Sequence, residues 1–147
     1  PHLILETSRK ESKMNQKQKN PQSSPSGEVI KTAKNVAKQK VAAGSLTQVQ
    51  VLLDEKDGAP NFALRQFTME EGGGMPLHTN TVEHEQYVLR GKGRIVIGET
   101  VHEVEAGDVI YIPAGTPHSY GVLQAPFEFL CVVPNTIDQL KILNNQC

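Results

Sequence analysis

The sequence of 147 residues has little of what marks an exported or membrane-bound protein. It has only two cysteines, Cys131 and Cys147, which are too few for a disulfide framework. Cys131 lies in the apolar run 127–133, where we expect a buried free thiol. No stretch approaches the roughly 18 apolar residues of a membrane-spanning helix, and residues 1–6 are too short for the core of a signal peptide. These absences predict a protein of the reducing cytoplasm with no membrane partner.

A large excess of charge of one sign is also missing. The formal net charge is −1, from 15 basic and 16 acidic residues, so the total gives no reason to expect a nucleic-acid partner. Basic residues outnumber acidic ones before Glu28, and acidic residues outnumber basic ones after it. Tryptophan is absent, and no aromatic residue lies among the basic residues of the N-terminal segment, as stacking on bases would require. We therefore expect no nucleic-acid partner.

The first 27 residues differ in composition from the rest of the chain. They are rich in Lys, Gln, Asn, Ser and Pro, and after Leu5 they hold almost no apolar residues. Such a segment buries too little apolar surface to offset the entropy of ordering, so we predict a flexible basic and polar tail over 1–27. The part before Met14 would also fit an expression tag or an upstream extension of the reading frame. We expect one folded domain over residues 28–147.

From residue 28 onward, short β-type runs alternate with glycine and proline, which is typical of an antiparallel sandwich or barrel. The glycine-rich segments 70–74 and 91–93 are interpreted as turns between strands. Residues 29–42 fit either a short amphipathic helix or an edge strand, and residues 137–143 a final helical turn. The predicted strands are 46–54, 61–69, 84–90, 93–98, 100–104, 108–112, 118–123 and 127–133.

Two stretches, 72–91 and 107–118, hold side chains that one metal ion could collect. Imidazole nitrogen and amide oxygen both bind divalent cations, and successive residues of a strand alternate between its faces. A histidine at the start of the strand 84–90 would share its inward face with Val88. A single histidine in a strand more often serves packing or hydrogen bonding, so the spacing alone leaves metal binding open. The candidate metal ligands are His78, Asn80, His84 and His118.

These two stretches resemble the motifs of small single-domain cupins, which read G-x5-H-x-H-x(3,4)-E-x6-G and G-x5-P-x-G-x2-H-x3-N. His78 takes the first histidine position, Asn80 the second, and His84 the glutamate position, as in one branch of these cupins. His118 fits the second motif, whereas Val122 stands where asparagine is expected. The resemblance implies an all-β fold, an antiparallel jelly-roll barrel also described as a double-stranded β-helix.

The resemblance also implies a divalent transition metal held by three histidines, with Asn80 as a fourth, loose ligand or as a neighbour of the ligands. Because all four groups are neutral, a bound ion would keep its charge and favour anionic ligands. Ligands of this kind are compatible with Mn, Fe, Ni, Zn or Cu, and do not choose among them. Small cupins commonly pair through sheet edges, so we expect a homodimer to which residues 28–42 contribute an exchanged edge strand.

The main functional hypothesis is a metal-binding cupin that binds or converts a small oxygen-rich anion, such as a keto acid, a diketone or a sugar acid, by Lewis-acid chemistry. If the protein is an enzyme, a metal-dependent isomerase or lyase needs the fewest assumptions. One alternative is a three-histidine Fe(II) dioxygenase. The other is a non-catalytic ligand-binding or sensor barrel, because Asn80 replaces an expected imidazole.

Two further side chains are candidates for ligand binding. Arg65 alternates with Phe67 and Met69, so it either faces the interior, where it would clamp a carboxylate, or lies on the surface of a strand buried by its other face. Alternation along the strand does not decide between these two faces. Gln86 shares the face of His84 and would orient a ligand, although an inward glutamine commonly bonds to backbone. We expect Tyr87, Tyr111 and Tyr120 to be packing residues.

Overall fold

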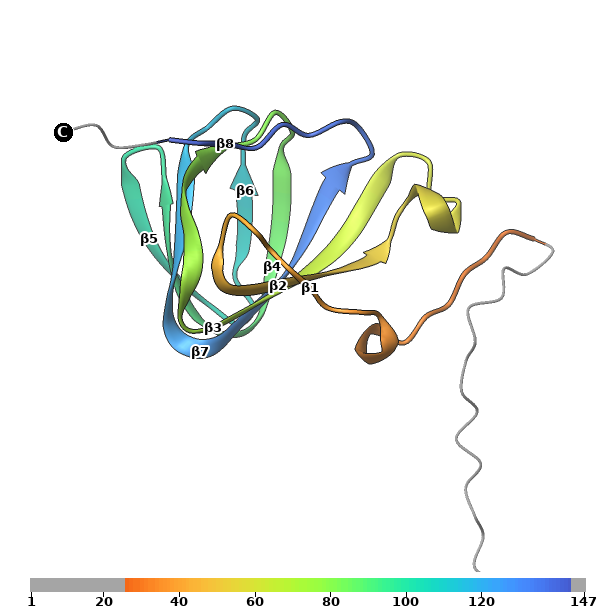
Figure 1. Cartoon of the computed structure of the whole chain (residues 1–147), viewed down its shortest axis with the longest axis horizontal. Helices are drawn as coiled ribbons and strands as arrows, with labels where there is room; N and C mark the ends of the chain where they lie inside the picture. The colour runs from red at the N-terminus through yellow and green to blue at the C-terminus, as the bar shows by residue number, and fades with distance from the viewer. Residues whose placement is uncertain (1–25, 144–147) are drawn as a thin grey trace, which may run out of the picture.

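The structure is a computed structural model that describes residues 26–143 (Figure 1). Apart from the short 3-10 helices η1 (Ala33–Asn35) and η2 (Glu55–Asp57), its regular structure is all β, which confirms the predicted fold class. The prediction of a flexible tail over 1–27 falls outside the described residues, except for 26 and 27. The strands are β1 (Gln39–Lys40), β2 (Ser45–Leu53), β3 (Phe62–Thr79), β4 (His84–Ile97), β5 (Thr100–Glu105), β6 (Val109–Ile112), β7 (His118–Pro134) and β8 (Lys141–Ile142).

The strands pair only with antiparallel neighbours, in the order β1-β2-β3-β7-β4-β5, with β6 beside β4 and β8 beside β3. Three long strands, β3, β4 and β7, take part in both layers of the barrel (Figure 1). Their segments 62–69, 84–88 and 127–134 lie in one layer with β2 and β6. Their other segments form the second layer with β5 and β8. The interior between the layers holds the core and the cavity described below.

The predicted breaks inside these long strands were wrong. The runs 84–90 and 93–98 form one strand, β4, the runs 118–123 and 127–133 form β7, and the run 61–69 continues to Thr79. Glycines make bends instead of turns in β3, at 72–74, and in β4, at 91 and 93, and the pairing register shifts there. The bend of β7 has Ala125 and Pro126 instead of glycine. Gly91 has φ +75°, and a Cβ atom at this position would collide with the carbonyl of Pro126 on β7. Glycine thus lets β4 cross from one layer to the other at close approach to β7.

Two predictions at the ends of the domain also need correction. Of the alternatives for residues 29–42, the amphipathic helix is wrong: only the single turn η1 forms, and the edge strand is limited to β1. The helical turn predicted over 137–143 does not form. This segment contains β8, in which Ile142 and Lys141 pair with His78 and Thr79 of β3. The open edge of β3 offers unpaired backbone groups, and the amide of Leu143 donates to the carbonyl of Leu77 at 2.9 Å. Tertiary pairing overrides the local helical preference here.

The core consists of inward side chains from the long strands. Met69, Val88, Ile95 and Phe127 are fully buried, and Cys131 is buried as expected of a free thiol. Of the three tyrosines expected to be packing residues, Tyr120 is buried, whereas Tyr87 and Tyr111 are largely exposed. Alternation along β4 places Tyr87 between the buried Gln86 and Val88, so its ring points outward. None of the helical segments in residues 26–143 has the length and apolar character needed to cross a membrane.

Candidate functional site

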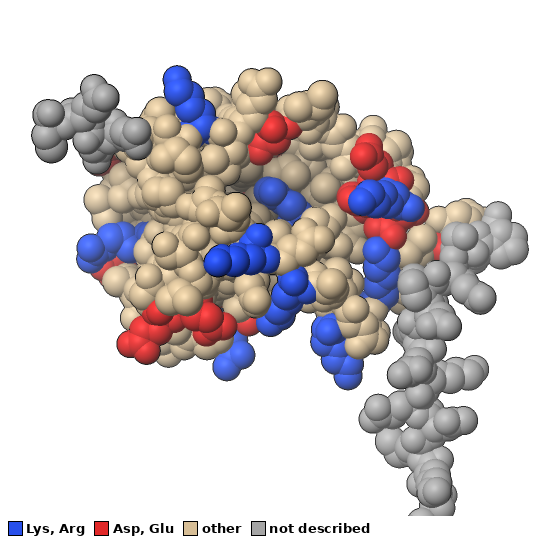
Figure 2. Space-filling view, in the orientation of Figure 1, with Lys and Arg blue, Asp and Glu red and all other residues tan. Residues whose placement is uncertain are grey.

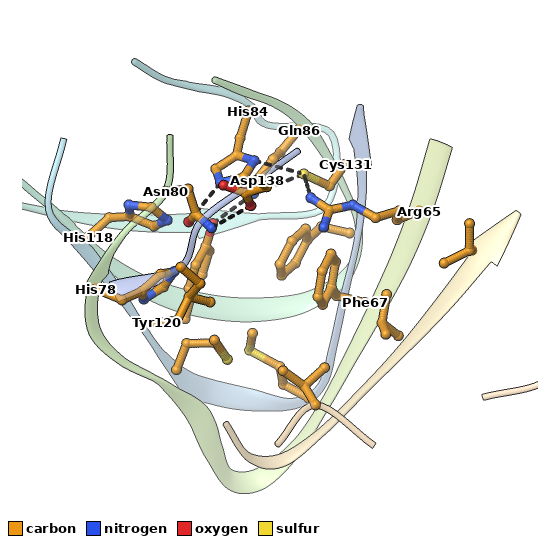
Figure 3. Close-up of a pocket in the computed structure, with 17 residues that line it drawn as sticks. Arg65, Phe67, His78, Asn80, His84, Gln86, His118, Tyr120, Cys131 and Asp138 are labelled. Carbon is orange, nitrogen blue, oxygen red and sulfur yellow. Dashed lines mark hydrogen bonds between the residues drawn. The ribbon is translucent and has the colours of Figure 1, made fainter. Parts of the chain in front are cut away.

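A cavity of about 260 Å³ lies inside the barrel (Figure 3). Its walls come from β2, β3, β4 and β7, and from the segment 135–143 that leads into β8. Most of the lining is apolar, and the polar side chains gather in two groups, the imidazoles on one side and a guanidinium on the other (Figure 3). All six residues singled out from the sequence line this cavity: Arg65, His78, Asn80, His84, Gln86 and His118.

Three buried imidazoles lie together on one side of the cavity. His78 on β3 and His118 on β7 are paired across the sheet, with ring centroids 4.2 Å apart, and the ring of His84 lies 5.5 Å from that of His118. Nδ1 of His78 lies 2.7 Å from the carbonyl oxygen of Pro76, and Nδ1 of His118 lies 2.8 Å from that of Thr116. A carbonyl only accepts hydrogen bonds, so both Nδ1 atoms carry the proton and both Nε2 atoms keep a free lone pair. Nε2 of His118 is buried and has no hydrogen-bond partner.

His84, Asn80 and Asp138 form a chain of hydrogen bonds. Nε2 of His84 lies 3.0 Å from Oδ1 of Asn80, and Nδ2 of Asn80 donates to Asp138 at 2.7 Å. The second carboxylate oxygen of Asp138 accepts the backbone amide of Thr81 at 3.0 Å. Sequence reasoning missed Asp138, because its contact with Asn80 exists only through the return of the segment 135–143 along the edge of β3. The carboxylate also changes the expected electrostatics, since it places a negative charge next to a group of ligands predicted to be neutral.

Burial keeps the imidazoles of His84 and His118 uncharged. It lowers the pKa of His84 to about 4, and the positive charge of Arg65 acts in the same direction. Burial also lowers the pKa of His118 to about 4, against an opposing effect of the carbonyl of Thr116. Neutral imidazoles at pH 7 have the protonation state that metal ligation requires.

The side chains of this group do not by themselves form a complete metal site. Within residues 26–143, no three His, Cys, Asp or Glu side chains are arranged so that they would hold an ion. The three imidazoles share one cavity, and their role as metal ligands remains a prediction.

Arg65 faces the cavity, which decides between its two predicted orientations. It lies on the face of β3 that also carries the buried Met69, whereas Phe62 is exposed. Nη2 of Arg65 donates to Sγ of Cys131 at 3.2 Å, and the guanidinium lies 5.0 Å from the ring centroid of Phe67. Its Nε is buried without a hydrogen-bond partner, and no ion pair within residues 26–143 involves Arg65. A partly buried guanidinium without a carboxylate partner is an unbalanced charge that an anion would neutralise.

Gln86 and Tyr120 form a second polar pair in the same cavity. Nε2 of Gln86 donates to the hydroxyl oxygen of Tyr120 at 2.7 Å, and Oε1 of Gln86 is buried without a partner. Burial raises the pKa of Tyr120 above its usual value, so its hydroxyl stays protonated. The pair thus offers one acceptor, the amide oxygen, and one donor, the phenolic hydrogen. Gln86 bonds to a side chain and not to backbone, unlike most inward glutamines.

The charged side chains on the surface do not gather into a patch of one sign on the face seen in Figure 2, where small basic and acidic groups both appear. Ion pairs such as Lys92–Glu105 and Arg94–Glu103 join opposite charges across β4 and β5. This face offers no extended basic surface of the kind that tracks a nucleic-acid backbone.

Comparison with known proteins gives a consistent result. Residues 65–133 match the family model described as cupin domain. The structure is similar to the polyketide cyclase RemF from Streptomyces resistomycificus, with a TM-score of 0.70 and 31% sequence identity over 79% of this chain and 87% of RemF. It is also similar to a cupin 2 conserved barrel domain protein from Rhodopseudomonas palustris, with a TM-score of 0.66 and 28% identity over 76% of this chain and 79% of that one.

One curated relative is an uncharacterized protein from Methanocaldococcus jannaschii, 34% identical over 71 residues. The match includes 47% of this chain and 57% of that protein, so the chain covers little more than half the length of this relative.

Proposed function

The chain is a small single-domain cupin, and from this premise we propose that its barrel binds one divalent transition-metal ion and uses it to bind or convert a small oxygen-rich anion. The proposed ligands are His78, His84 and His118, with Asn80 as a fourth, weaker donor. Manganese, iron, nickel, zinc and copper all suit these donors. When bound, such an ion supplies Lewis-acid polarisation of a carbonyl or enediolate oxygen.

The observation that carries the proposal is the state of Nε2 of His118. It is buried and unpartnered, while Nδ1 of the same ring is fixed by the carbonyl of Thr116. Leaving a buried polar atom unpaired costs about 1–3 kcal/mol, so a native protein keeps one only for a reason. Histidines that bind metals typically anchor one ring nitrogen to a carbonyl in this way. His78 repeats the arrangement through Pro76.

His84 fits the same role in one of its two tautomers. If Nδ1 carries the proton, it can donate toward Sγ of Cys131, 3.7 Å away, and the lone pair of Nε2 becomes free. Nε2 of His84 and Oδ1 of Asn80, which lie 3.0 Å apart, would then both act as donors to the ion. The bond from Asn80 to Asp138 supports this role, because it turns the amide oxygen toward His84.

The likeness to RemF supports a diketone among the three expected ligand classes. RemF is a polyketide cyclase, and polyketides carry alternating carbonyl groups of the β-diketone type. In this chain Arg65 would bind an acidic group of the ligand by charge-assisted hydrogen bonds, and Gln86 would orient it. The proposed roles of these two residues are binding and orientation, and no general base is proposed.

Two alternatives remain within the same site. Three histidines with iron would suit a dioxygenase, in which oxygen is the second substrate. A barrel that binds its ligand without turnover would need the same cavity but no reaction, and the replacement of an expected histidine by Asn80 favours it.

Elemental analysis of tag-free protein purified without chelator tests the proposal first. We expect about one divalent ion per chain, and loss of the ion in His84→Ala. His102→Ala is the matched control, because His102 is an exposed histidine on β5 outside the cavity. Protein that binds none of the five metals, even after incubation with each, would overturn the proposal. The metal found would then separate oxygen chemistry, for iron, from Lewis-acid chemistry, for manganese or zinc.

We also propose that two chains pair. The outer face of the layer that contains β4 and β6 has an apolar groove, lined by Leu64, Tyr87, Val109, Tyr111, Leu130 and Val132. Val109 and Tyr111 are 75% and 57% exposed. Large apolar side chains that lie next to each other on a surface are commonly covered by a partner. A second chain would cover them. Light scattering that gives the mass of a single chain would contradict this.

A further inference from the structure

The walls of the cavity indicate which kind of oxygen-rich anion it takes. Away from the imidazoles, Arg65 and Gln86, much of the lining is made of side chains without polar groups, including Val49, Val51, Met69 and Met75. A sugar acid would place several hydroxyl groups against these walls, and each hydroxyl left without a partner there would weaken binding. An apolar body of the ligand would instead gain free energy by leaving water.

Three rings of the lining are nearly parallel. Phe67 and Phe129, paired across β3 and β7, have centroids 5.2 Å apart and planes at 17°. Tyr120 continues the series on β7, with its centroid 5.3 Å from that of Phe129 and planes at 11°. The three rings stack on one another and line this part of the cavity with aromatic carbon, against which an apolar ring of a ligand can pack.

The polar groups of the cavity are placed for a ligand with adjoining polar groups. Arg65, with Phe67 beside it, lies across from His78 and His118 (Figure 3). His84 lies between them, with its Nδ1 3.7 Å from the sulfur of Cys131 to which Arg65 donates. Arg65 has a buried, unpartnered Nε, and the carboxylate of Asp138, the acidic group in the lining, is already bonded to Asn80 and Thr81. The unpartnered Oε1 of Gln86 would accept a hydrogen bond from an enol hydroxyl of a conjugated ligand.

We propose that the ligand is an aryl-substituted keto acid or diketo acid: a carboxylate bound by Arg65, conjugated carbonyl or enol oxygens at the imidazoles and Gln86, and a flat apolar ring against the wall of Phe67, Phe129 and Tyr120. The placement of the ligand's carbonyl or enol oxygens at the imidazoles rests on the proposed function. The placement of the carboxylate and of the ring rests on the residues that line this cavity. The proposed ligand class excludes sugar acids.

Four compounds test the parts separately by calorimetric titration. Benzoylpyruvate carries the carboxylate, the diketone and the ring; acetylpyruvate has a methyl group instead of the ring; benzoylacetone has a methyl group instead of the carboxylate; and glucuronate is a sugar acid. Benzoylpyruvate is expected to bind at least about tenfold more tightly than acetylpyruvate, from the apolar area of the ring. It is expected to bind at least about tenfold more tightly than benzoylacetone, from the charged hydrogen bonds. Glucuronate is expected not to bind.

Two variants connect these differences to residues. Arg65→Met should abolish the advantage of benzoylpyruvate over benzoylacetone, whereas Arg94→Met, at an exposed arginine of β4, should leave it unchanged. Phe67→Leu should reduce the advantage of the ring over the methyl group. If acetylpyruvate or glucuronate binds as tightly as benzoylpyruvate, the inference is overturned.

Titrations of protein stripped with chelator and of metal-loaded protein keep this inference apart from the proposed function. Tight, Arg65-dependent binding of benzoylpyruvate to protein that takes up no metal would support the aryl acid and refute the metal. Metal-loaded protein that does not prefer the aryl acid would refute the inference and leave the metal site standing.

Discussion

Asp138 lies near the C-terminal end of the chain, but it supports the candidate site. Its carboxylate accepts hydrogen bonds from the amide of Asn80 and from the backbone of Thr81, and so connects the segment 135–143 to the end of β3. The bond to Asn80 also sets which end of that amide points toward His84. One acidic side chain thus acts on both stability and the orientation of a proposed ligand.

Replacing Asp138 by Ala is therefore expected to lower the free energy of unfolding by about 1–3 kcal/mol, because the buried amide of Asn80 loses its acceptor. It should also weaken metal binding by about tenfold or more, as loss of a group that orients a ligand does. Urea denaturation and a chelator-competition titration measure the two effects. Asn135→Ala is the matched control, since Asn135 bonds to the carbonyls of Ala59 and Phe62 in the same segment but away from the imidazoles. Equal metal affinity in both variants would mean that Asp138 serves only the fold.

Asn80 allows a test in the opposite direction. Asn80→His introduces a stronger donor at the position where the cupin motif has a histidine, and the carboxylate of Asp138 is placed to accept the second N–H of the new ring. We expect metal affinity to rise by about tenfold or more, a gain of about 1.4 kcal/mol or more. The titration with a competing chelator measures it. Unchanged affinity would place residue 80 outside the group of ligands.

At the level of single residues, the sequence predicted well what depends on alternation along a strand. The inward direction of His84 and Gln86 follows from their parity with Val88. The direction of Arg65 did not follow, because apolar residues occur on both faces of that strand. Asp138 could not be predicted, since its partner depends on how a segment remote in sequence folds back.

At the level of elements, the bends of the long strands position the whole cavity. Gly91 allows β4 to pass from one layer to the other beside the bend of β7. The sequence pointed to this place, but a glycine pair between two β-type runs is compatible both with a turn and with a bend. The pairing of both halves of β4 with β7 shows that the chain makes a bend at this place.

Gly91→Ala is expected to destabilise the protein by about 3 kcal/mol or more, because a left-handed residue gains a Cβ atom and that atom also meets the backbone of Pro126. Gly98→Ala separates the two causes. Gly98 also has positive φ, +60°, but a Cβ atom there would contact nothing within 4 Å, so we expect a loss of only about 1–2 kcal/mol. Urea denaturation of both variants measures the difference. Similar losses would mean that the close approach of β4 and β7 adds nothing.

The helix η2 is connected to the N-terminal segment by the ion pair of Lys31 and Asp57, at 2.6 Å. The hydrogen bond from Lys31 lowers the pKa of Asp57. A lowered carboxyl pKa gives stability that is present above the pKa of the unfolded chain and lost as the pH falls through the folded value. Lys31→Met should therefore cost about 0.5–1 kcal/mol at pH 7 and little at pH 2 to 3. Urea denaturation across this pH range checks it against Lys34→Met, which breaks no ion pair found among the described residues.

At the level of the whole molecule, the apolar groove on the outer face predicts how two chains meet. Val109→Lys places a charge in this groove and should convert a dimer into single chains, seen as half the mass in light scattering. Val101→Lys is the control, because Val101 on β5 is also exposed, at 58%, but does not line the groove. If both variants remain dimeric, the chains pair elsewhere, for instance through residues 28–42 as the resemblance to small cupins suggested.

The sharing of β3, β4 and β7 between the two layers also limits how a ligand reaches the cavity. The two layers cannot move apart to open the cavity, because the same continuous strands run through both. Val41, which follows β1, and Leu140, which precedes β8, line the cavity, and each of these two strands pairs through only two residues. We therefore expect fraying of these short edge strands to set the rate at which a ligand escapes. The residence time of a ligand would then depend on β1 and β8, and its affinity on the side chains that line the cavity.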